Sequence, residues 1–120
     1  MWSHEKRECY SAKVAKYGNF WYFEMSLRRH YKIDIEVNRR RIRKVIVDPH
    51  YEAKHPEIND FLILRLVALL DGNEYPEDGR KGSWAFFSLD PIELMGRHYR
   101  LVWCLRDEEE FLGVINSFRR

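Results

Sequence analysis

The chain has 120 residues, of which 45% are apolar and 33% charged, and its formal net charge is +2. These values predict a single domain, residues 1–120, whose core needs neither a structural metal nor a disulfide between the distant Cys9 and Cys104. No stretch reaches the ~18 apolar residues of a membrane span and the first residues lack a signal-peptide core, so we expect a cytoplasmic protein without membrane contact.

The N-terminal half predicts three strands joined by short turns. Charged residues 5–17 can form a short helix, and the turn signal at Gly18-Asn19 separates them from an aromatic-rich strand at 20–29. Residues 31–37 alternate strictly between apolar and charged side chains, which is typical of a half-buried strand. A turn then leads into a strand at 42–48, so the three strands should form an antiparallel meander.

Residues 39–44 contain five bases, and most of the excess of positive over negative charge in the first half of the chain lies there. Basic patches attract phosphate backbones and speed their capture. Charged side chains also protect solvated turns and edge strands, and the sequence leaves both interpretations open. On the first interpretation this segment binds RNA through Arg39, Arg40, Arg41, Arg43 and Lys44.

A helix over about residues 60–70 is the most distinct predicted element. Every residue from 61 to 70 except Arg65 is apolar, Asn59 or Asp60 can cap the N-terminus, and Gly72 supplies a C-terminal stop. A helix that is apolar all round must be covered on most sides. We therefore expect it at the centre of the fold, packed on the sheet and covered by the N-terminal segment or another subunit.

The rest of the chain predicts a loop at 71–82 and three further strands, at 83–89, 98–106 and 110–119. Trp84, Trp103 and Cys104 fall within these strands and are expected in the core. Strands, then one helix, then strands is the order of an α+β fold. The expected architecture is an antiparallel sheet of five to six strands packed on one buried central helix.

Residues 48–57 hold the densest set of acid–base groups, with two histidines, a tyrosine, a lysine and three carboxylates. His50 and His55 are five positions apart, which does not place two ligands on one helix face, and no CxxC or HxxxH pair occurs. The glycines form no phosphate-binding loop, so we expect neither a metal nor another cofactor.

General acid–base chemistry on an RNA phosphodiester is what these residue types can still support. His50, His55 or Lys54 can act as base or acid, because imidazole exchanges protons near neutrality. The guanidinium groups of Arg100 and Arg119 can offset the negative charge that builds up on the phosphorus in the transition state. The phenol ring of Tyr51 or Tyr99 can stack on an RNA base. The alternative interpretation is a helix entrance with ordinary surface polar residues.

The last two predicted strands resemble the closing strands of RelE-type toxins, within the barnase-, EndoU-, colicin- and RelE-like ribonucleases. The similar segments are His98-Tyr99-Arg100-Leu101-Val102-Trp103 and residues 111–119. The resemblance implies a metal-independent endoribonuclease toxin with RNA as substrate and a cognate antitoxin as partner. It makes Arg100 and Arg119 the basic residues of the paired strands, and His50 or His55 the acid–base residue. The sequence departs from that family in placing three strands before the helix and in its low net charge.

A non-enzymatic interaction protein is the competing class: an immunity protein, an antitoxin partner or a phage-encoded inhibitor. Aromatic residues and arginine anchor many protein interfaces. The candidate contacts are Trp2, Trp21, Tyr22, Trp84 and the loop at 71–82. The sequence does not indicate an oligomeric state.

Overall fold

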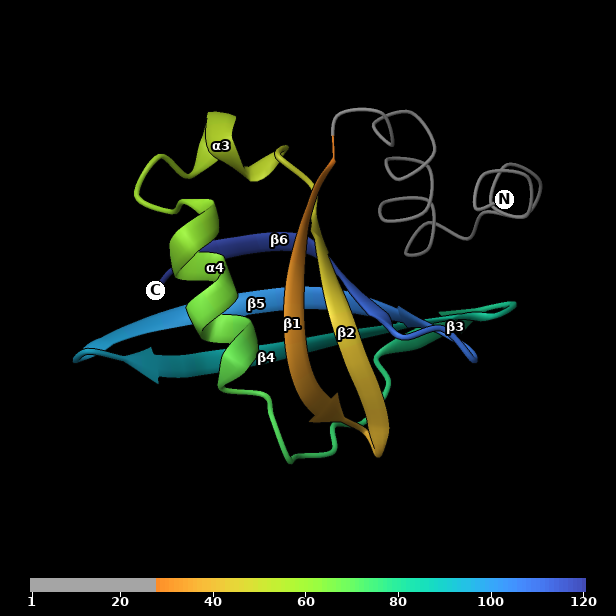
Figure 1. The fold of residues 1–120 in the computed structure, drawn as a ribbon. Coiled ribbons are helices and arrows are strands. Elements are labelled where there is room, and N and C mark those ends of the chain that lie inside the picture. The colour runs from red at the N-terminus through yellow and green to blue at the C-terminus, as the bar shows by residue number, and fades with distance from the viewer. Residues whose placement is uncertain (1–27) are drawn as a thin grey trace.

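The computed structural model describes residues 28–120, which form a six-stranded sheet and two short helices (Figure 1). The α+β class is therefore confirmed. The predicted helix at 5–17 and most of the predicted strand at 20–29 lie outside the described residues. In chain order the elements are β1 (Arg29–Val37), β2 (Arg40–Val47), α3 (Tyr51–Lys54), α4 (Asp60–Ala68), β3 (Gly79–Lys81), β4 (Trp84–Leu94), β5 (Arg97–Arg106) and β6 (Phe111–Arg119).

Strands β1 and β2 form the hairpin that the alternating pattern predicted. Their turn consists of Asn38 and Arg39, with φ angles of 54° and 63°, and Val37 pairs with Arg40 across it. Two left-handed residues in succession give the turn a twist that suits a tight hairpin. The Asn38 side chain also donates to the Tyr75 carbonyl at 3.0 Å and accepts from the Tyr75 N–H at 2.8 Å, which ties the hairpin to the loop after α4.

The sheet is mixed, whereas the sequence predicted an antiparallel one. Its order is β1-β2-β6-β5-β4-β3, and β2 runs parallel to β6 over Lys44–Val47 and Phe111–Val114. The long connection between these strands, which contains both helices and three strands, allows a parallel pairing that adjacent strands cannot make. β2 lies inside the sheet order, but its pairing with β6 begins only at Lys44, so Arg40, Arg41 and Arg43 precede that pairing.

Helix α4 begins as predicted and is less buried than predicted. The Asn59 side chain accepts a hydrogen bond from the Leu62 N–H at 2.8 Å, which caps the first turn. Ile63 and Leu66 face the sheet, but the exposed fractions of Phe61 and Leu69 are 70% and 46%. Among residues 28–120 the helix packs on the sheet through one side only, and none of these residues covers its outer side. A second helix, α3, lies within the predicted polar segment.

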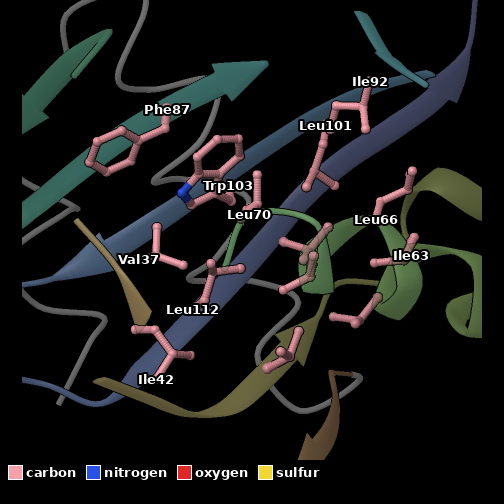
Figure 2. Close-up of a cluster of buried hydrophobic side chains, with 14 of the residues drawn as sticks. Val37, Ile42, Ile63, Leu66, Leu70, Phe87, Ile92, Leu101, Trp103 and Leu112 are labelled. Atoms are coloured by element: carbon pink, nitrogen blue, oxygen red, sulfur yellow. The ribbon is translucent and has the colours of Figure 1, made fainter. Parts of the chain in front are cut away.

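The main core lies between α4 and the sheet (Figure 2). Trp103 is fully buried and stacks on Phe87 with ring centres 5.6 Å apart. A second buried cluster contains Trp84 and Cys104, so the prediction that Trp84, Trp103 and Cys104 are core residues is confirmed. Within the part of the chain described here, no helix is long and apolar enough to cross a membrane.

Candidate active site at the end of strand β6

Strand β6 loses one of its two neighbours before it ends. Its pairing with β2 stops at Val114, whereas its pairing with β5 continues to Arg119. The chain leaves β2 at Asp48, whose N–H donates to the Val114 carbonyl at 3.2 Å. Farther along, the Glu57 carboxylate accepts from the Arg119 N–H at 3.3 Å. The polar segment 48–57 therefore crosses the open edge of β6.

This crossing brings His55 against the end of β6. Its ring stacks on Phe118 with centres 5.2 Å apart and an angle of 24° between the ring planes. Its Nδ1 lies 3.7 Å from the nearer Glu57 carboxylate oxygen. At this distance the carboxylate is an electrostatic neighbour of the imidazole and not its hydrogen-bond acceptor, so the stacking on Phe118 is the contact that sets the ring plane. His55 is about one quarter exposed, so a substrate can reach it.

Glu57 is held as a carboxylate. Its pKa lies below the usual value because its own backbone N–H and that of Arg119 donate to it, and because His55 and Arg119 add positive potential. Its burial acts in the opposite direction and is outweighed.

Two guanidinium groups lie at the same phenyl ring. The Arg100 Cζ is 5.9 Å from the centre of Phe118 and the Arg120 Cζ is 5.8 Å from it. Arg120 also pairs with Asp90 at 3.1 Å. Arg100 makes no ion pair with any carboxylate among residues 28–120, so its charge is available to an anionic ligand.

The predicted pair of arginines is divided between the two faces of the sheet. Arg100 pairs with Phe118, and Arg119 pairs with Tyr99. Since side chains alternate along a strand, Arg119 is directed away from the face that carries Arg100 and Phe118. His50 lies at the start of α3, where its N–H donates to Asp48 at 3.0 Å.

The two tyrosines considered for base stacking are core residues. Tyr51 is 1% exposed and its hydroxyl donates to Asp60 at 2.5 Å, and Tyr99 is 6% exposed. Neither presents an open ring face to a base. Lys54 is exposed on α3.

The basic segment 39–44 is largely balanced by carboxylates. Lys44 is exposed, and each of the four arginines has an acidic partner. The pairs are Arg39 with Glu74, Arg40 with Asp107, Arg41 with Asp34 and Arg43 with Glu110. Exposed pairs of this kind contribute little to stability, about 0–1 kcal/mol each, so a phosphate could displace them. Near this hairpin lies a shallow cavity of about 430 Å³ with mixed charge, lined by Asp34, Ile35, Glu36, Arg39, Arg41 and Asp71.

Four residues at this end of the sheet were not predicted: Glu57, His98, Phe118 and Arg120. Strand alternation places His98 on the same face as Arg100, and the Arg120 N–H donates to the His98 carbonyl at 2.7 Å. The same alternation in the sequence could have linked Phe118 with Arg120. The position of Glu57 depends on the crossing over β6, which the sequence does not reveal.

Within residues 28–120, no three His, Cys, Asp or Glu side chains group closely enough to hold a metal ion. Comparisons of the chain with protein-family models, with curated proteins and with solved structures gave no match.

Proposed function

We propose that the protein is a metal-independent endoribonuclease that cleaves RNA at the end of β6. One observation carries the proposal: His55, backed by Glu57, stacks on Phe118 beside the guanidinium groups of Arg100 and Arg120. An oriented imidazole next to cations is what the cleavage of a ribose phosphodiester requires.

In this mechanism a base takes the proton of the ribose 2′-hydroxyl, whose oxygen attacks the phosphorus. The bond to the 5′-oxygen breaks, and an acid protonates that leaving oxygen. The products are a 2′,3′-cyclic phosphate and a 5′-hydroxyl end. His55 fills one of these roles, and His98, on the same strand face as Arg100, is our candidate for the other. Arg100 and Arg120 offset the negative charge of the phosphorane.

The pairing of β5 with β6 supports the proposal, because it places the two segments that resemble RelE-type toxins side by side. On this proposal RNA is the substrate, and a cognate antitoxin that covers the site is the expected partner. Phe118 then takes the stacking role for which Tyr51 and Tyr99 were considered, since both of these rings are buried.

The test is incubation of the purified full chain with RNA in EDTA. Wild-type protein should cleave the RNA and leave 2′,3′-cyclic phosphate ends. His55→Ala should lower the rate by about 10²- to 10⁴-fold, the usual contribution of general acid–base catalysis. His30→Ala is the matched control, because His30 is exposed on β1, which lies two strands from β6 in the sheet order.

A substrate with a 2′-deoxyribose at the cleaved position should resist cleavage completely. If wild-type protein leaves RNA intact at high concentration, or if His55→Ala cleaves as fast as wild type, the proposal is wrong. A loss of activity in His50→Ala but not in His55→Ala would transfer the acid–base role to His50 and contradict the site described above.

A further inference from the structure

A surface on the outer side of α4 carries large apolar side chains that no other residue of the segment 28–120 covers. Phe61 and Leu69 are 70% and 46% exposed, and Met95, in the turn between β4 and β5, is 78% exposed. Phe61, Arg65 and Leu69 are four positions apart and therefore lie along one helix face. We call these four residues, Phe61, Arg65, Leu69 and Met95, the α4 patch.

Arg65 connects the two parts of the patch. Its guanidinium carbon lies 5.9 Å from the centre of the Phe61 ring, and its Nη1 donates to the Met95 sulfur at 3.3 Å. In the described part of the chain, Arg65 makes no ion pair with a carboxylate. A positive charge held between apolar side chains is complementary to a carboxylate that is itself flanked by apolar side chains.

Met95 has a backbone conformation that does not suit its side chain. Its φ is 53°, that of Gly96 is 79°, and Leu94 pairs with Arg97, so Met95 and Gly96 form a two-residue hairpin turn. Asn and Gly are the preferred residues in such turns, because other side chains clash with the backbone when φ is positive. An exposed methionine at this position costs stability, and such strain is often found at binding sites.

We propose that the α4 patch docks a short segment of a different protein, in which an Asp or Glu lies between two large apolar residues. A second copy of this chain fits less well. Symmetric pairing through α4 would set Arg65 against the same residue of the other copy, and four side chains are few for a stable dimer. The proposal concerns a surface separate from the ribonuclease site and does not depend on it.

The test is a selection of random short peptides displayed on phage against the full chain. Enriched peptides should share an acidic residue flanked by large apolar residues, and synthetic copies should bind in solution. Arg65→Glu and Phe61→Ser should each weaken that binding by at least about tenfold. Arg41→Glu, an equal change in charge at an exposed position on β2, should not weaken it.

Met95→Asn separates binding from folding. It replaces the strained residue with one that favours the turn, so it should raise the thermal unfolding midpoint while weakening peptide binding. Three results would overturn the proposal: enrichment of peptides without an acidic residue, equal binding by wild type and Phe61→Ser, or a concentration-dependent dimer that Arg65→Glu changes. Ribonuclease activity should be unchanged in Arg65→Glu, Phe61→Ser and Met95→Asn, so either proposal can fail without the other.

Discussion

Replacing Asp60 by Ala should destabilise the fold, because three side chains donate hydrogen bonds to the Asp60 carboxylate and would lose their acceptor. Arg29 donates to the two Asp60 oxygens at 2.5 and 2.9 Å, Tyr51 donates at 2.5 Å, and the Tyr31 hydroxyl donates to the same carboxylate. Burial of Asp60 would raise its pKa, but these donors outweigh that effect and the pKa lies below its usual value. The carboxylate therefore holds β1 and α3 to the first turn of α4.

The magnitude follows from the burial of each partner. Tyr51 is 1% exposed, so its hydroxyl would lose its acceptor without gaining water, at a cost of about 1–3 kcal/mol. The Arg29 side chain is 38% exposed, and we therefore assign its pair only about 0–1 kcal/mol. With a smaller contribution from Tyr31, the expected loss in the free energy of unfolding is about 3 kcal/mol.

Urea denaturation at neutral pH of the Asp60→Ala and Tyr51→Phe variants and of the double variant measures these contributions. Tyr51→Phe removes the hydroxyl that would be left unpaired, so Asp60→Ala should cost about 1–2 kcal/mol less in the Tyr51→Phe background. Since the folded pKa of Asp60 is depressed, its stabilisation is present above ~pH 4 and should be lost as the pH falls through the folded pKa. A cost of Asp60→Ala below ~1 kcal/mol, or strictly additive effects, would refute the argument.

Two further stability predictions follow from single residues. Burial raises the pKa of Asp48 to about 6, against partial compensation by the His50 N–H and Arg28, so protonation favours the folded state. Wild type should therefore gain about 2 kcal/mol of unfolding free energy relative to Asp48→Asn when the pH is lowered from 7 to 4, as measured by urea denaturation at each pH. Arg39→Gly should raise the unfolding free energy by about 0.5 kcal/mol, because Arg39 has a φ of 63°, and Arg39→Ala should not; thermal melts would show the difference.

Local patterns in the sequence predicted the local structure well. The alternation in residues 31–37 predicted a strand, and β1 contains it. Asn59 was one of two residues expected to cap the central helix, and its side chain does so. These predictions succeeded because strand alternation and helix capping depend on residues only a few positions apart.

Features that depend on distant residues could not be predicted in this way. The parallel pairing of β2 with β6 joins segments more than sixty positions apart, and nothing within either strand specifies its direction. The composition of residues 61–70 predicted a covered helix, yet Phe61 and Leu69 remain exposed. A uniformly apolar helix carries no signal for the side that faces the sheet.

The candidate site has the same long-range origin. Because β2 leaves β6 at Val114, the last residues of β6 have a free edge, and the segment after β2 covers it with His55 and Glu57. In a wholly antiparallel meander β6 would be an edge strand beside β5 alone, and the segment after β2 would not leave the sheet next to it. The same strand end is held firmly on its other side by β5 as far as Arg119. A rigid strand on one side and polar side chains on the other hold the imidazole beside the arginines, which is the arrangement that the proposed cleavage of a phosphodiester would use.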